Sequence, residues 1–180
     1  MVKHPAVFLD RDGTIISDVG HIRDSSMVEF FPFSIQALRK LKYHYLLFII
    51  TNQSGISKGI LTEKEVERVN KDIEDKLVLS NIRISETFFC PHQNKDNCNC
   101  KKPNPFFINH AAARYNLDLS RSFIIGDHPS DIECGLNAGV TPIYLLTGHG
   151  EKHRDELIHK VHVCENLMDA SELILSTLKI

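Results

Sequence analysis

The chain has 180 residues, a length that fits a single domain. Hydrophobic residues make up 42% and charged residues 24% of it, a balance that excludes wholesale disorder. Its 21 basic and 23 acidic side chains leave a net charge of −2, which argues against a protein that works mainly on nucleic acid or on an anionic membrane. No apolar run approaches the roughly 18 residues of a membrane span, and the N-terminus has no signal-peptide region. We therefore expect a cytoplasmic protein whose five cysteines do not form a secreted disulfide framework.

Short apolar runs alternate along the chain with stretches of helical periodicity. The runs predict strands at residues 6–9, 45–50, 87–89, 122–125, 142–146 and 161–163. Apolar residues at helical spacing predict helices at residues 35–41, 62–77, 105–116, 130–138 and 166–179. A capping box at Thr62 marks the start of the second helix. This alternation indicates an α/β fold with a Rossmann-like parallel sheet flanked by helices, in one domain over residues 1–180.

Polar side chains follow several of the predicted strands. Asp10 and Asp12 come directly after the first strand, two residues apart, so that both can face one cavity. Their mutual repulsion is relieved when a cation lies between them. Thr51 and Asn52 end the second strand and offer donors suited to phosphate oxygens, while Asp127 ends the fourth. Because the carboxyl ends of parallel strands meet at one edge of the sheet, we expect these side chains to share a site.

Further charges complete this predicted site. Lys101 and Lys102 supply positive charge, and Asp131 adds a carboxylate four residues after Asp127. Carboxylate oxygens beside phosphate favour Mg²⁺ over zinc. A carboxylate nucleophile, a second carboxylate that transfers protons, a lysine and Mg²⁺ together describe phosphoryl transfer through an aspartyl-phosphate. The alternative interpretation is that the aspartates only terminate strands, since Asp is common in turns.

The same residues resemble the four motifs of the haloacid dehalogenase (HAD) superfamily of phosphatases. The motif residues are Asp10-Arg11-Asp12-Gly13-Thr14, Thr51-Asn52, Lys102 and Asp127. With the Cys–His cluster described below, the chain resembles one capless subgroup, which contains D-glycero-D-manno-heptose 1,7-bisphosphate 7-phosphatase and histidinol-phosphate phosphatase. The resemblance implies a Mg²⁺-dependent phosphatase that acts on the 7-phosphate of the heptose bisphosphate, with histidinol phosphate or another small sugar phosphate as the alternative substrate.

The resemblance also implies a role for each matched residue. Asp10 is expected to be the nucleophile and Asp12 the general acid/base, while Thr51 and Lys102 hold the transferring phosphoryl group. The implied Mg²⁺ ligands are Asp10, the main-chain carbonyl of Asp12, Asp127 and the main chain of His128. The implied substrate contacts are Arg11, Asp18, His21, Asn52, Gln53, Ser54 and Lys101.

A cluster of three cysteines and one histidine precedes the two lysines. Cys90, His92, Cys98 and Cys100 carry the ligand types of tetrahedral zinc, and four protein ligands indicate a structural site. Two disulfide-capable pairs are the alternative, which a cytoplasmic chain disfavours. The resemblance supports zinc, because such a loop typifies the subgroup. We therefore expect an inserted zinc-binding loop at residues 90–102, hereafter the Cys–His loop.

Two positions depart from the pattern of the subgroup. Lys101 stands where an arginine is usual, which keeps the charge but loses a planar bidentate donor. Phe106 and Phe107 follow Pro103-Asn104-Pro105, where Gly-Met is usual. Both changes border the substrate loops and bear on substrate identity more than on the reaction. The short spans between the predicted strands and helices leave no room for a cap domain.

Functions of two other classes compete with the phosphatase. A phospho-accepting signalling domain would also phosphorylate Asp10, but a general acid/base at Asp12 speeds hydrolysis and disfavours it. A nucleic-acid-binding zinc knuckle would need an aromatic platform and a basic stripe, which the loop lacks. We therefore expect a monomeric enzyme with a small phosphorylated substrate and no nucleic-acid or membrane partner. Cys134 and Cys164 are expected to be packing residues. His149 lies past a predicted strand end and could face the site, but an ordinary loop residue is the preferred interpretation.

Overall fold

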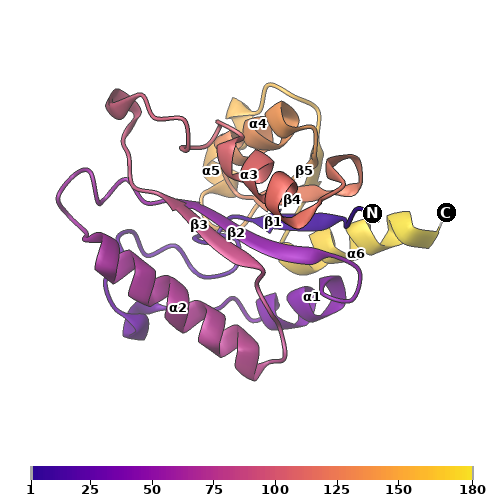
Figure 1. Ribbon diagram of the computed structural model, residues 1–180, viewed down its shortest axis with the longest axis horizontal. Coiled ribbons are helices and arrows are strands. Elements are labelled where there is room, and N and C mark those ends of the chain that lie inside the picture. Colours follow the sequence, from indigo (N-terminus) through magenta and orange to yellow (C-terminus); the bar gives the residue numbers. More distant parts are fainter. Residues whose placement is uncertain (1, 180) are drawn as a thin grey trace.

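The computed structural model describes residues 2–179 and contains one six-stranded parallel sheet (Figure 1). Its strands are β1 (Ala6–Leu9), β2 (Leu46–Asn52), β3 (Glu86–Cys90), β4 (Phe123–Gly126), β5 (Thr141–Leu145) and β6 (His162–Cys164). They lie in the order β3-β2-β1-β4-β5-β6, and every neighbouring pair is parallel. The predicted α/β fold and its parallel sheet are therefore confirmed.

Helices connect the strands. They are α1 (Ser34–Leu41), α2 (Glu63–Leu79), α3 (Phe106–Tyr115), α4 (Pro129–Ala138), α5 (Gly150–His153) and α6 (Leu167–Ser176). The capping box is present, since the Thr62 hydroxyl accepts from the main-chain N–H of Glu65 and the Glu65 carboxylate accepts from that of Thr62. The sequence did not predict α5, because four residues are too few to show helical periodicity. The helix expected to reach residue 179 ends at Ser176 and continues as a 3-10 turn.

Two helical layers cover the sheet, as Figure 1 shows. Apolar side chains of α1, α2 and α6 form one buried cluster with Val7 and Leu9 of β1, and those of α3 and α4 form the other with Ala6 and Phe8. This alternation of neighbouring strand residues is what burial on both faces requires. Cys134 lies inside the second cluster and Cys164 packs against the first, which confirms both as packing residues.

The carboxyl ends of β1, β2 and β4 meet at one edge of the sheet. Leu9 pairs in register with Ile49 of β2 and with Ile125 of β4, so the residues that follow these strands become neighbours. Between β1 and α1 the chain forms the 3-10 turn Ser25–Met27 and two isolated β-bridges, Asp12–Ile16 and Ile16–Phe30, and between β2 and α2 it forms no helix or strand. Neither of these described segments carries a cap domain. No helix within residues 2–179 is long and apolar enough to cross a membrane.

Candidate active site

A tight turn after β1 builds the first wall of the site. The main-chain N–H of Asp10 donates to the carbonyl of Ile125, and the N–H groups of Ile15 and Ile16 both donate to the carbonyl of Arg11. Gly13 adopts a φ of 81°, and a Cβ there would lie 2.1 Å from Oδ2 of Asp127. Only glycine therefore permits this turn to approach the aspartate at the end of β4 so closely.

Lys102 lies at the centre of the site, where it is 4% exposed. Its Nζ is 2.5 Å from a carboxylate oxygen of Asp10 and 2.5 Å from one of Asp131, and it donates to the carbonyl of Ile50 at 2.9 Å. Burial alone lowers the pKa of a lysine, but the carboxylates of Asp10 and Asp131 more than offset this and raise it. The ammonium therefore stays charged between two acidic side chains.

Three carboxylates converge around this lysine. Asp10, Asp127 and Asp131 each offer an oxygen within 4.8 Å of the others. Burial raises the pKa of Asp10 well above its ordinary value, and burial together with the charge of Asp131 raises the pKa of Asp127 to about 7. A single lysine thus does not neutralise the cluster, and a set of oxygen donors with excess negative charge fits a hard divalent cation such as Mg²⁺.

Asp12 is held at the pocket wall by donors on both of its oxygens. The guanidinium of Arg11 donates to Oδ2 through Nε and to Oδ1 through Nη2, each at 3.0 Å. The side-chain amide of Gln53 also donates to Oδ2 at 3.0 Å, and the hydroxyl of Thr51 does so at 3.3 Å. The carboxylate of Asp12 is therefore fixed in orientation while 15% of its side chain stays accessible.

These groups line an open pocket of about 570 Å³. Most of the residues expected to act there lie on its wall: Asp10, Asp12, Asp18, His21, Thr51, Asn52, Gln53, Ser54, Lys101, Lys102, Asp127 and His128. Arg11 does not, because it is 1% exposed and its guanidinium is directed to Asp12 and to Asn70. The structure thus places Arg11 behind the pocket, although a substrate contact was expected of it.

The wall also includes residues that were not predicted to act there, among them Asn94, Ser130 and His149. His149 was expected to be an ordinary loop residue. Its main-chain N–H donates to Oδ2 of Asp127 at 2.7 Å, and its Nε2 lies 3.0 Å from a carboxylate oxygen of Asp18. The sequence feature that indicates this placement is the position of His149 just beyond the end of β5. In a parallel sheet, β5 ends at the same edge as β1, β2 and β4.

A side extension of about 290 Å³ adjoins the pocket. It shares Ser54, Asn94 and Lys101 with the main pocket and adds Lys58, Gln93 and Lys95. Three lysines therefore surround a recess beside the main pocket, and Lys101 belongs to both spaces. This arrangement gives the site a second region of positive charge.

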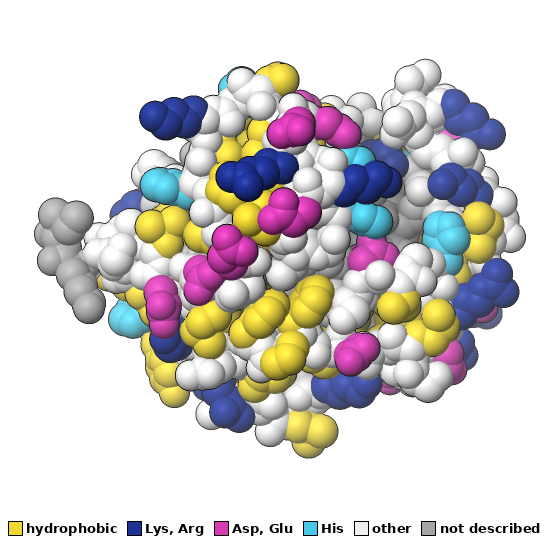
Figure 2. All heavy atoms as spheres, turned by 180° about the vertical axis from the view of Figure 1, so that it is seen from behind, with side chains coloured by type: hydrophobic (Ala, Val, Ile, Leu, Met, Phe, Trp, Pro, Cys, Tyr) yellow, Lys and Arg dark blue, Asp and Glu magenta, His cyan; other side chains and the backbone are white. Residues whose placement is uncertain are grey.

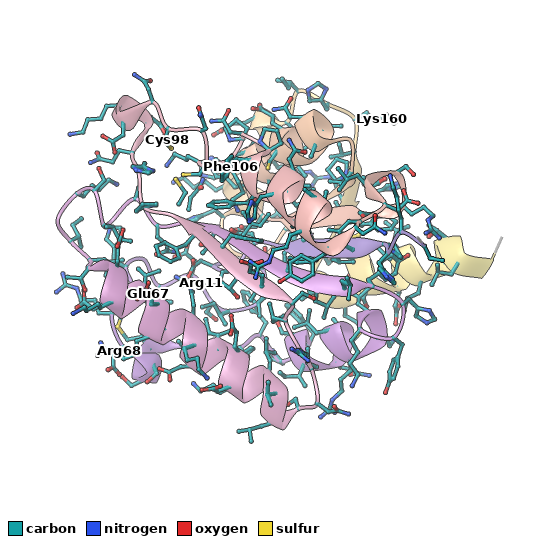
Figure 3. All side chains as sticks on the ribbon, viewed as in Figure 1. Arg11, Glu67, Arg68, Cys98, Phe106 and Lys160 are labelled. Atoms are coloured by element: carbon teal, nitrogen blue, oxygen red, sulfur yellow. The ribbon has the colours of Figure 1, made fainter. Side chains whose placement is uncertain are left out.

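The Cys–His loop brings its four expected ligand residues together next to the pocket, in the region where Figure 3 labels Cys98. The Sγ–Sγ distances among Cys90, Cys98 and Cys100 are 3.6, 3.1 and 3.7 Å, and Nδ1 of His92 lies 3.6 and 3.4 Å from the Sγ atoms of Cys90 and Cys100. A tetrahedral zinc with bonds of about 2.3 Å to sulfur places its ligands about 3.8 Å apart. The four donors therefore fit such an ion.

Hydrogen bonds join the Cys–His loop to the loop after β2. The hydroxyl of Ser57 donates to a carboxylate oxygen of Asp96 at 2.6 Å, and the amide of Gln93 donates to that hydroxyl at 3.1 Å. Farther along, the main-chain N–H of Lys102 donates to the side-chain oxygen of Asn52 at 3.1 Å. The conformation of the Cys–His loop therefore affects where Lys102 and Asn52 lie.

Known proteins are similar to this chain in sequence. Residues 99–170 match the HAD-hydrolase-like family. The chain is 37% identical over 176 residues to a D-glycero-beta-D-manno-heptose-1,7-bisphosphate 7-phosphatase of Helicobacter pylori, which covers 97% of this chain and 99% of the relative. It is 33% identical over 182 residues to a D-glycero-alpha-D-manno-heptose-1,7-bisphosphate 7-phosphatase of Photorhabdus laumondii, with 96% and 97% of the two chains covered.

A solved structure that is similar to this chain is also a heptose bisphosphate phosphatase. The D,D-heptose 1,7-bisphosphate phosphatase from B. bronchiseptica, solved with magnesium and phosphate, superposes with a TM-score of 0.89 at 28% identity, covering 96% of this chain and 99% of that one. The full-length identity to the sequence relatives, the shared fold and the convergent carboxylates and lysine lead to one conclusion. The chain belongs to the heptose 1,7-bisphosphate 7-phosphatase family of HAD-like hydrolases.

Proposed function

We propose that this protein is a Mg²⁺-dependent phosphatase that removes the 7-phosphate of D-glycero-D-manno-heptose 1,7-bisphosphate through an aspartyl-phosphate. The observation that carries the reaction is the position of Lys102, which lies 2.5 Å from both Asp10 and Asp131 at the floor of an open pocket. Phosphoryl transfer to a carboxylate brings the negative carboxylate next to the negative phosphate. A fixed cation beside the carboxylate offsets this repulsion, which is the arrangement seen here.

Each step has a group in place. A carboxylate oxygen of Asp10 attacks phosphorus, and the bond between phosphorus and the sugar oxygen breaks while the carboxyl of Asp12 gives its proton to the leaving oxygen. Asp12, now a carboxylate, then takes a proton from water, the water oxygen attacks phosphorus, and the bond to Asp10 breaks to release inorganic phosphate. Lys102 and Thr51 hold the phosphoryl oxygens during both steps.

The cation belongs beside these groups. Asp10, Asp127 and Asp131 would hold Mg²⁺, with the main-chain carbonyl of Asp12 and the main chain of His128 as the further contacts that the family resemblance implies. When bound, Mg²⁺ neutralises charge on the carboxylates and on the phosphoryl oxygens. A structure of a relative solved with magnesium and phosphate supports this assignment.

The lysine-lined extension supports a bisphosphate substrate. We propose that, with one phosphate at Lys102, a second phosphate on the same sugar occupies the recess that Lys58, Lys95 and Lys101 surround. A substrate with a single phosphate, such as histidinol phosphate, would leave these charges unused. We further propose that Asp18, His21, Asn52, Gln53 and Ser54 contact the sugar, and that Arg11 acts from behind the pocket.

The Cys–His loop is proposed to hold a structural zinc ion. Four protein donors leave no open position for catalysis, so the ion would act by fixing the loop that carries Lys101 and Lys102. Thiol ligands of this kind suit a reducing compartment, which supports the cytoplasm. We also propose that the protein acts as a monomer. Figure 2 shows basic and acidic side chains interspersed on one face of the molecule, without a continuous basic stripe there.

The substrate and the nucleophile are tested together. We expect kcat/KM for the heptose bisphosphate to exceed that for histidinol phosphate and for fructose bisphosphate, each measured with saturating Mg²⁺. Replacement of Asp10 by Asn (D10N) should abolish phosphate release from all three, because no carboxylate nucleophile remains. Retained turnover in D10N would contradict the aspartyl-phosphate, and a preference for histidinol phosphate would contradict the substrate assignment while leaving the reaction intact.

A further inference from the structure

Arg11 is one of the largest side chains that the structure buries completely, at 1% exposure. It lies between α2 and the sheet, beneath the pocket rather than on its wall (Figure 3). Nε and Nη2 of its guanidinium face the two oxygens of Asp12, and Nη1 donates to the side-chain oxygen of Asn70 at 2.6 Å. A charged group this deeply buried is tolerated only when its donors are satisfied.

Asn70 comes from the middle of α2 and is 7% exposed. Its neighbours on the buried face of this helix are Val66, Val69 and Ile73, all apolar, which is the ordinary composition of a face that packs against a sheet. A polar side chain among them has to be accounted for by a partner, and the partner is the guanidinium of Arg11. The contact therefore connects the helix layer to the carboxylate that transfers protons.

We propose that Asn70 is a positioning residue for Asp12, acting through Arg11. The proposal rests on the phosphatase reaction described above. The guanidinium is rigid and planar, so the hydrogen bond that holds Nη1 at Asn70 also sets the directions of Nε and Nη2. Without Asn70, the buried Nη1 of Arg11 has no hydrogen-bond partner, and the guanidinium then turns or shifts to find another acceptor for it. Asp12 moves with it.

The consequence should appear in the proton-transfer steps. Asp12 must reach the leaving oxygen in the first step and water in the second, and a displacement of about 1 Å can lower the rate about 100-fold. Binding of the phosphate at Lys102 does not involve Asn70 and should persist. Loss of Asn70 is therefore expected to lower kcat while KM stays within about twofold, and the loss should depend on how much the leaving group needs a proton.

The test uses the full-length protein with its metals bound, and compares N70L, N70A and N70D. N70L and N70A remove the acceptor with side chains of two different sizes, whereas N70D keeps an oxygen acceptor for Arg11. The matched control is V69A, which truncates the fully buried neighbour of Asn70 on the same helix. Folding is compared by urea denaturation, and turnover is measured on the heptose bisphosphate and on 4-nitrophenyl phosphate, whose leaving group needs no proton.

We expect N70L and N70A to lose about 10-fold to 100-fold in kcat on the sugar phosphate. On 4-nitrophenyl phosphate they should form a burst of nitrophenol followed by slow turnover, because only the water step still needs Asp12. N70D should stay near the wild type, and V69A should lower the urea midpoint without this dependence on leaving group. A first step on 4-nitrophenyl phosphate that is slowed as much as on the sugar phosphate, so that no burst forms, or an unchanged kcat in N70L and N70A, would overturn the role of Asn70 while D12N still loses activity. Absence of turnover in the wild type would overturn the phosphatase itself, and the role of Asn70 with it.

Discussion

At the scale of single residues, the predicted site and the structure agree where strand geometry decides the outcome. Asp10 and Asp127 follow parallel strands, and Thr51 lies near the end of another. Parallel strands end at one edge of a sheet, so the sequence alone predicts that the three residues lie together. Arg11 differs because a turn, not a strand, sets its direction, and the turn directs its side chain under the sheet. The contact of Lys102 with Asp131 joins a loop residue to one in the first turn of α4, 29 positions apart, and periodicity carries no information on such a contact.

The raised pKa of Asp127 predicts that Mg²⁺ binding depends on pH. Burial first, and then Asp131, raise this pKa to about 7, so below that pH a proton must leave before the cation binds. In the metal-free protein the folded state binds this proton more tightly than the unfolded chain, so stability falls as the pH rises from about 4 to about 7. Mg²⁺ should therefore raise the Tm more at pH 8 than at pH 6.

Thermal unfolding at a series of Mg²⁺ concentrations measures this dependence. Affinity for Mg²⁺ should fall by up to about tenfold per pH unit below pH 7 for one displaced proton. The variant D127N carries no titrating group at this position and serves as the control, with weaker and less pH-dependent binding. Equal Mg²⁺ affinity of the wild type at pH 6 and pH 8 would contradict the assignment of Asp127 as a ligand.

At the scale of elements, the six strands and the longer helices could be predicted because each carries its own periodic pattern. The Cys–His loop has no apolar periodicity, and only its ligand types revealed it. Its docking could not be predicted, since Ser57 and Asp96 are ordinary exposed polar residues until the fold brings them to 2.6 Å. The loop has a single short 3-10 turn, Asn94–Asp96, and no apolar core of its own.

Removal of zinc should therefore lower activity indirectly. Without the ion, the four ligand residues of the loop are no longer held together, and the hydrogen bond between the main chain of Lys102 and the side chain of Asn52 weakens. We expect a zinc-selective chelator, applied with Mg²⁺ in excess, to reduce kcat/KM about 10-fold to 100-fold while the far-UV circular dichroism of the sheet persists. C98S should behave like the chelated protein and C164S, outside the cluster, like the wild type. Full activity of zinc-free protein would show that the ion does not shape the site.

At the scale of the whole molecule, the two apolar clusters share their strands. Val7 and Leu9 belong to one cluster and Ala6 and Phe8 to the other, so neither layer of helices can separate from the sheet without exposing residues that adjoin the other layer. The described segments between β1 and α2 contain no cap domain, so the pocket is formed by the loops at the edge of this one sheet. The active site and the core are thus parts of one structural unit, which supports the prediction of a single domain.

This shared core predicts that damage to either layer destabilises the whole molecule in one transition. L77A truncates a fully buried side chain of α2 and I108A one of α3, and each should lower the free energy of unfolding by about 2–5 kcal/mol. L79A, at a leucine of α2 that is 88% exposed, should change it by at most about 0.5 kcal/mol. Urea unfolding followed by tyrosine fluorescence, far-UV circular dichroism and enzymatic activity should give coincident midpoints for every variant. If activity in I108A were instead lost at a lower urea concentration than the circular dichroism signal, the two layers would unfold independently. The chain would then contain more than one cooperative unit.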